Sequence, residues 1–531
     1  MKRRDFIKLS TVAGVAGVVG SRIDNATANP LYEQASGFDL HPFIKAHPEA
    51  VFVYLTDVKE KTDQKGTYDA GNKLAREMFV STSGGAGYPN STKIAGKPNW
   101  TCAPQDRDDP TASMGIITDI GFTEGYLNGV RSKGPQQIYL RECACPQDWE
   151  RLGYTAMAQR NNFDLTNLVA RDPWEYENGE IVFKEVNGTI FKEIGYLGPC
   201  ASPDSFLINL AKFKTHGKGV TVTIKNLQGI AARRFHSFCS TADAFRSLPT
   251  GYHRFYQPDY MDKVAELHKK HVEAGIPRWN ERMERAPFNA GLLQEFWVQR
   301  MLDSYSVIPV NNGIHIVEGV YWRDGDGFTL GPHYGKAKDF MCNMSLFGKN
   351  PFSVDIIAHW LAGHEPGNFG LFHIGIERGL SNVLDPFDIP VYIWRNGRAS
   401  RTRLNRLKRF PLLTPFNQKE GEDYYHLCNE PFDYKAWKAT GKIAVNNKPS
   451  IRTLGTDSNN HIVMDMNVPQ QGDVYVDIKN SQGEVVWRMH APDLEPGNHQ
   501  VVWDGFSQPG MYNAYIKGME WDAESEMVIY T

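Results

Sequence analysis

The chain has 531 residues, a formal net charge of −3 and 12% aromatic residues, a length that suits two or three globular domains. The slightly acidic balance argues against nucleic acid as a partner. The seven cysteines are sparse, odd in number and without C-x₂-C spacing, which argues against a disulfide scaffold and against an iron–sulfur cluster held by the chain itself.

The first 28 residues have the features of an export signal. Arg3 and Arg4 precede a glycine-rich apolar run that is too short for a transmembrane helix, and "ATA" ends at Ala28. This segment resembles a twin-arginine signal peptide, and the alternative is an anchor or an incidental basic start. Cleavage would remove five basic and two acidic side chains and move the formal charge from −3 to −6. We expect the twin-arginine translocase to carry the protein to the periplasm, the cell surface or the extracellular space.

An α/β domain is expected over residues 39–385. Short apolar runs at 49–58, 136–143 and 205–213 are typical of buried strands, and a helical pattern between the first two ends at Gly134. Strand, helix and strand in this order predict a mixed, partly parallel sheet with flanking helices.

Later segments of this domain extend the same pattern. Amphipathic helices are expected at 261–275 and 290–305, a strand at 313–322, and a helix that Pro351 opens and Gly363 closes. His268 and His271 lie three residues apart among lysines in the first of these helices, and we expect both to be solvated.

Residues 386–440 are expected to form a connector. Its basic stretch at 395–410 suits a solvated surface, and the alternative is contact with an anionic surface or a glycan.

The composition changes at residues 441–531. Period-two alternation with turn signals at Gly472 and Gly483 predicts a small antiparallel sandwich. The stretches "VDIKNSQGEVV", "LEPGNHQVVWDG", "GMYNAYI" and "SEMVIY" resemble the Ig-like domain of flagellar hook-capping proteins and the sorting domains of type IX secretion substrates. The resemblance implies an Ig-like sandwich that serves as a spacer, as a contact with a glycan or the cell surface, or as a sorting tag.

The most informative stretch is "FLINLAKFKTHGKGVTVTIKNLQGI". If a parallel strand ends near residue 213, Lys214 and His216 lie at its carboxyl end, where ligands of α/β sheets bind. Lysine there suits a phosphate or carboxylate, and histidine can donate, accept or bind a metal. The alternative is a solvated loop.

That stretch resembles the signature of the domain of unknown function 362 family, which has an apolar strand, Lys-x-Lys-x-His, Gly-Val-Thr and Lys-Asn-Leu. "AGKPNW" at 95–100 and "PFSVDIIAHWLAGHEPGNFGLFHIGIERGL" resemble its early and late segments. The resemblance covers roughly residues 90–385 and leaves the activity open. Some members are fused to ferredoxin-like modules, which implies a third role, as a redox accessory of an iron–sulfur partner.

Acidic residues form a second candidate group. Glu318, Asp324, Asp326, Asp355 and His359 could make an oxygen-rich site for a divalent metal, or a general acid/base pair. The alternative is a common Asp-Gly-Asp-Gly turn and an aspartate that caps a helix or pairs with an arginine.

These observations leave two main hypotheses. The first is an exported enzyme that holds a small anionic molecule in a Lys/His-lined crevice, and the second is a non-catalytic ligand-binding or cell-surface protein. The candidate residues are catalytic Lys214, His216, Lys225 and Asp355; substrate-binding Lys97, Asn99, Thr221 and Asn226; and metal-binding Glu318, Asp324, Asp326, Asp355 and His359.

Overall fold

A computed structural model gives the structure of most of the chain. It describes residues 36–100, 114–216, 219–232, 235, 250–274, 276, 290–308, 312–324, 337–412, 431–441, 449–456, 461–505 and 509–529. The expected signal peptide lies outside these residues. Across the described ranges, no helix has both the length and the hydropathy needed to span a membrane.

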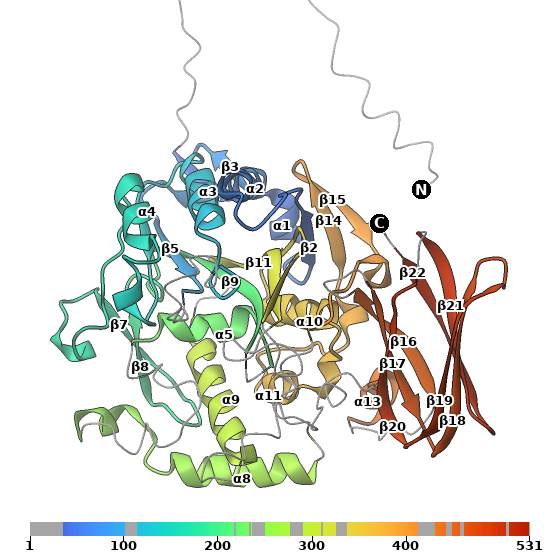
Figure 1. The fold of residues 1–531 in the computed structure, drawn as a ribbon. Coiled ribbons are helices and arrows are strands. Elements are labelled where there is room, and N and C mark those ends of the chain that lie inside the picture. The colour runs from blue at the N-terminus through green and yellow to red at the C-terminus, as the bar shows by residue number, and fades with distance from the viewer. Residues whose placement is uncertain are drawn as a thin grey trace, which may run out of the picture. The chain divides into compact units, whose positions relative to one another are not determined.

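A central sheet of ten strands organises the α/β part (Figure 1). Its main path is β15 (Arg398–Thr402), β14 (Val391–Arg395), β2 (Val51–Leu55), β13 (Met344–Gly348), β11 (Gly313–Asp324), β9 (Ser205–His216), β5 (Lys93–Pro98) and β6 (Ile138–Leu140). β10 (Gly219–Thr221) pairs with β9, and β12 (Lys338–Met341) pairs with β11.

The sheet is mixed, as the sequence predicts. β11, β9, β5 and β6 are parallel neighbours, as are β14 and β2, whereas β13 runs antiparallel to both of its neighbours. All twelve residues of β11 are buried. Continuous apolar runs suit these strands because helices cover both faces of a parallel sheet.

The two faces of β9 pack against different helices (Figure 1). Its even-numbered Phe206, Ile208 and Leu210 share a core with α2 (Gln64–Met78) and α3 (Ile120–Arg131). The odd-numbered Leu207 and Phe213 share another core with α5 (Thr223–Leu227), α9 (Ala290–Ser306) and α10 (Pro351–Leu361).

Smaller elements complete the α/β part. Among the described residues, the other strands are β1 (Gly37–Leu40), β3 (Phe79–Thr82), β4 (Tyr88–Pro89), β7 (Ile181–Glu185) and β8 (Glu193–Leu197). The other described α-helices are α1 (Pro42–Ala46), α4 (Tyr154–Asn161), α8 (Tyr260–Glu273), α11 (Gly370–Glu377) and α13 (Tyr434–Thr440).

Several element boundaries differ from the sequence prediction, and two of these differences concern β9 and α3. β9 continues past residue 213 to His216, because β10 returns along it as an antiparallel partner. The helical sequence pattern covers residues 114–134, but α3 begins only at Ile120, where the Asp119 carboxylate accepts a hydrogen bond from Phe122 N at 2.8 Å. The helix predicted between Pro351 and Gly363 is confirmed as α10.

The C-terminal part consists of two antiparallel sheets. One contains β16 (Ser450–Thr456), β17 (Ile462–Val468) and β20 (Gly497–Trp503), and the other contains β19 (Val485–Leu494), β18 (Gly472–Asn480), β21 (Gly510–Lys517) and β22 (Asp522–Ile529). Inward residues such as Met464, Val476 and Ile516 form one core between them. The predicted all-β character of this region is confirmed.

Candidate functional site

Several candidate residues lie at or just after the carboxyl ends of β5 and β9, namely Lys97, Asn99, Lys214 and His216. β6, β5, β9 and β11 run parallel, so their carboxyl ends lie at the same edge. Ligands of open α/β sheets bind outside the carboxyl ends of strands. A ligand site is therefore expected at this edge of the sheet.

A row of buried polar residues crosses three of these strands. The register places Lys97 of β5 beside Asn209 of β9, and Asn209 beside His315 of β11. Asn209 Nδ2 donates to Thr223 O at 3.0 Å and lies 3.1 Å from His315 Nδ1. The row thereby connects the sheet to the first residue of α5.

Lys97 has a full set of partners inside the protein. Its Nζ donates to Glu142 Oε2 at 2.9 Å, Asn226 Oδ1 at 2.8 Å and Pro98 O at 2.7 Å. An ammonium has three protons to donate, and these contacts use all of them. Lys97 therefore fixes the position of Asn226 in α5.

Glu142 follows β6 and is a member of this network that the sequence analysis missed. Besides Lys97, it accepts hydrogen bonds from Trp100 N at 3.0 Å and Cys143 N at 2.9 Å. The available signal was its position directly after a strand of the parallel sheet.

Asn226 holds α5 against the sheet. Its Nδ2 donates to Lys97 O at 3.0 Å and to Asn209 Oδ1 at 2.7 Å. Together with the bond that it accepts from Lys97, these contacts occupy both ends of the amide. Asn226 is thus bonded to two neighbouring strands.

The other face of the sheet carries a second buried ion pair. Lys212 Nζ donates to Glu318 Oε2 at 2.7 Å, and both side chains are fully buried. The same ammonium lies 3.5 Å from the centre of the Tyr321 ring. Glu318 also accepts from Asp119 N at 3.1 Å and Val320 N at 3.0 Å.

Burial shifts the pKa values of Glu318 and Tyr321 in this second network. It raises the pKa of the Glu318 carboxyl, while the Lys212 ammonium opposes that rise. Burial also raises the pKa of the Tyr321 hydroxyl well above its usual range, and that hydroxyl donates to Asp119 Oδ2 at 2.9 Å. Lys212, Glu318, Tyr321 and Asp119 form a continuous buried chain of titratable groups, and the sequence analysis singled out only Glu318.

Asp355 caps α5 from a different helix. Its carboxylate accepts from Thr223 N and Ile224 N, each at 2.9 Å, and from the Thr223 hydroxyl. Val222 provides no side-chain cap of its own. Burial raises the pKa of Asp355 to about 7, and the three hydrogen bonds oppose this rise.

His359 lies one turn after Asp355 in α10 and has different neighbours. Its Nδ1 is 2.7 Å from Asp355 O, and its ring packs edge-on against Phe369 and Phe372. Burial lowers the pKa of His359 to about 4, so the imidazole is neutral at pH 7.

Lys214, His216 and Thr221 belong to the β9–β10 hairpin. The register pairs His216 with Gly219 and Lys214 with Thr221, whose hydroxyl donates to Lys214 O at 3.4 Å. Both Lys214 and Thr221 are buried. Residues 214–216 therefore continue the strand, and Lys214 does not lie in the solvated loop that was the alternative.

Lys225 and Asn99 are only half-buried. Lys225 Nζ lies 5.9 Å from the centre of the Trp297 ring, and Asn99 N donates to Thr118 Oγ1 at 2.8 Å.

The described acidic candidates do not converge on one point. Asp324 ends β11, and Asp326 lies outside the described residues. Within the part of the chain that the structure describes, no three His, Cys, Asp or Glu side chains lie close enough together to hold a metal ion.

The expectation that His271 is solvated is wrong. His271 is buried, with Nδ1 2.8 Å from Glu295 Oε2 and Nε2 2.8 Å from Glu377 Oε2. Burial acts to lower the pKa of His271, but the two carboxylates outweigh it and the net shift is upward. This cluster joins α8, α9 and α11.

Cys143 and Cys145 do not pair with each other. Cys145 is disulfide-bonded, whereas Cys143 is a buried thiol, as are Cys200 and Cys342.

The fold and this edge define an α/β protein with buried lysine–carboxylate pairs near the carboxyl ends of its parallel strands. Residues 94–359, half of the chain, match the family described as Domain of unknown function (DUF362), and the chain belongs to this family. The resemblance seen in the sequence is thereby confirmed. A search of curated proteins gave no match.

Proposed function

We propose that this protein is exported and binds a small anionic molecule at the carboxyl edge of the central sheet. The β9–β10 hairpin and α5 would form the binding segment, with Lys214, His216 and Lys225 as its basic groups. The observation that carries the proposal is the support of α5, which is bonded through Asn226 to two strands and capped by Asp355. A segment held by such buried contacts is preorganised for binding.

Lys97 and Lys212 take a different role in this proposal from that of Lys214. Each is bonded to a buried carboxylate, Lys97 to Glu142 and Lys212 to Glu318. We therefore assign Lys97 and Lys212 as positioning residues. Thr221 and Asn99 remain candidates for contacts with the bound molecule.

Acid/base catalysis at the same edge is a second candidate function. Asp355, with a pKa of about 7, can exchange a proton near neutral pH.

The role of Asp326, and with it a metal-assisted reaction, stays a prediction. Elemental analysis of protein purified without chelators tests it, and a stoichiometric metal would support it.

Export is supported by the twin arginines and by the disulfide at Cys145, since disulfides persist in oxidising compartments. Replacing Arg3 and Arg4 by lysine should leave the precursor in the cytoplasm, which immunoblotting of cell fractions would detect.

Calorimetric titration of residues 29–531 with inorganic phosphate, pyrophosphate and citrate tests the anion site. We expect at least one probe to bind, and Lys214→Met to weaken it tenfold or more. Lys435→Met, at an exposed position in α13, is the control and should bind as the wild type does. Equal binding by Lys214→Met and wild type, or no binding of any probe, would refute the proposal. Tight binding of a probe without turnover would favour a non-catalytic binding protein over an enzyme. The third hypothesis, a redox accessory, predicts that a pull-down with this protein recovers an iron–sulfur partner.

A further inference from the structure

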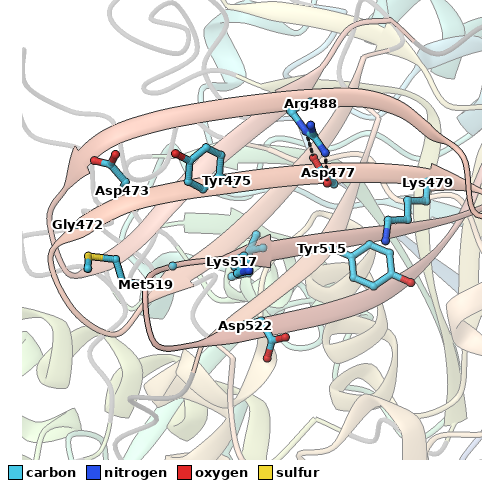
Figure 2. Close-up of a pocket in the computed structure, with 12 residues that line it drawn as sticks. Gly472, Asp473, Tyr475, Asp477, Lys479, Arg488, Tyr515, Lys517, Met519 and Asp522 are labelled. Carbon is cyan, nitrogen blue, oxygen red and sulfur yellow. Dashed lines mark hydrogen bonds and ion pairs between the residues drawn. The ribbon is translucent and has the colours of Figure 1, made fainter.

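A groove of about 920 Å³ lies on the outer face of the second C-terminal sheet (Figure 2). Its floor comes from β18 and β21, and Asp522 and the turn at Gly518 and Met519 lie at one end. This volume is within the range of small-molecule sites. The groove shares no residue with the carboxyl edge of the central sheet, so binding there would be independent of the proposed anion site.

The strand register sets the pattern of side chains in the groove. Tyr475 of β18 lies beside Lys517 of β21, and Asp477 lies beside Tyr515. The two tyrosines are therefore diagonal neighbours on adjacent strands, and the Cα atoms of such residues are typically about 7–8 Å apart. Two aromatic side chains placed in this way on one face can contact different rings of the same oligosaccharide.

Tyr475 is a fixed and accessible ring. It is 45% exposed, although large hydrophobic side chains usually turn away from water. One side of the ring stacks on His490, with centroids 4.5 Å apart and planes 9° apart. The ring also lines the groove. Such a ring suits the apolar C–H face of a sugar, because aromatic faces carry partial negative charge.

Polar groups beside the rings are held by neighbouring side chains. Arg488 bonds to Asp477 through two contacts of 2.5 and 2.7 Å, which Figure 2 marks. Lys479 Nζ lies 4.1 Å from the centre of the Tyr515 ring. Carboxylate, guanidinium and ammonium groups held in this way can exchange hydrogen bonds with hydroxyl groups at little cost in side-chain entropy.

The charge of the groove favours a neutral ligand. Its charged lining residues are three acids, Asp473, Asp477 and Asp522, and three bases, Lys479, Arg488 and Lys517. Because the signs balance, the groove offers no net attraction to a polyanion or a polycation. A neutral molecule with many hydroxyl groups matches both the rings and the mixed charges.

We propose that the outer face of the β19–β18–β21–β22 sheet binds a neutral oligosaccharide, with Tyr475 and Tyr515 as stacking platforms and Asp477 and Arg488 as hydrogen-bonding groups. A chain exported with this face would attach to a neutral glycan. A contact with a glycan was one of the roles expected for this domain from the sequence, and Tyr475, Tyr515, Asp477 and Arg488 are the residues proposed to make it.

Affinity gel electrophoresis of residues 29–531 tests the proposal. The gels would contain hydroxyethyl cellulose, soluble starch, galactomannan or a neutral xylan. We expect at least one polysaccharide to retard the wild-type protein, and Tyr475→Ala to weaken that retardation tenfold or more. Tyr475→Phe keeps the ring and should retain most of the binding.

Met511→Ala is the matched control, since Met511 is 48% exposed on β21 and does not line the groove. It should migrate as the wild type does, and thermal unfolding should show that all variants are folded. Equal retardation of Tyr475→Ala and wild type would overturn the proposal, as would no retardation in any gel. Retardation that disappears in 0.5 M NaCl would also overturn it, because it would reveal a purely electrostatic contact.

Discussion

At the scale of single residues, the lysines are informative because three of those that the structure describes are buried. Lys97, Lys212 and Lys214 are each at most 3% exposed, and lysine is almost never fully buried unless it is paired. Carboxylates from distant parts of the chain pair with the first two, Glu142 with Lys97 and Glu318 with Lys212. The positive charges of Lys97 and Lys212 therefore stabilise contacts inside the protein.

Glu318→Gln should strongly destabilise the protein. It would leave the Lys212 ammonium buried without a counter-charge, and breaking such a pair costs about 3–5 kcal/mol. Thermal unfolding should show a large fall in Tm for Glu318→Gln and a smaller fall for the double variant Lys212→Met/Glu318→Gln. Additive effects of the two substitutions would show that the pair is not coupled.

His271 should make stability depend on pH. Because its pKa is raised on folding, the contribution of His271 is complete below the unfolded pKa of about 6.5 and is lost as pH rises through the folded pKa. The Tm difference between wild type and His271→Gln should therefore be largest near pH 6 and shrink toward pH 9. A difference that does not change with pH would contradict this assignment.

At the scale of elements, the close packing of α2 against α3 depends on glycines. Gly121, Gly125 and Gly129 recur every fourth residue in α3 and share one face of the helix. A Cβ at Gly125 would overlap the backbone carbonyl of Tyr68 in α2, and one at Gly129 would press on Ala75. The helices can approach this closely because the side chains are absent.

Gly125→Ala should lower stability although alanine favours helices. The added methyl group would meet a backbone atom that cannot move aside, and such overpacking costs about 1–3 kcal/mol. Gly510→Ala in β21 is the control, since a Cβ there would have its nearest neighbour at 3.6 Å. Differential scanning calorimetry should show a lower Tm for Gly125→Ala only; a higher Tm would mean that the helices separate easily.

Elements were easier to predict than the partners of their side chains. Pro351, Gly363 and the apolar run between them define α10 locally, and the prediction is confirmed. β9 was predicted too short, because its apolar run stops near residue 213 and the lysine and histidine that follow were placed after the strand. What buries Lys212 is Glu318, 106 residues later. No local pattern carries that information, and the same applies to His271 and its partners in α9 and α11.

At the scale of the whole molecule, the C-terminal sheets are bonded to the α/β part. Arg452 of β16 forms an ion pair with Glu365, and Arg409 donates to Thr453 O at 2.8 Å. Val463 of β17 belongs to the same core cluster as α10. The C-terminal sheets therefore contribute to the stability of the residues that precede them.

Deleting residues 441–531 should leave a folded but less stable protein. Glu365 and Arg409 would lose these partners, while both main cores of the central sheet would keep nearly all their residues. Residues 29–440 should be soluble, with a lower Tm by circular dichroism than the full mature chain. Arg452→Ala in the full chain should reproduce part of the loss, and aggregation of the truncated chain would contradict a separable domain.

The cap of α5 also has a consequence for biosynthesis. The helix begins at Thr223, yet the carboxylate that caps it lies 132 residues further along the chain. Five residues cannot form a stable helix alone in water. The nascent chain must therefore extend past Asp355 before α5 can become stable, so α5 should acquire its protection from amide hydrogen exchange late in folding. Binding at the proposed anion site would then begin only once the α/β part is complete.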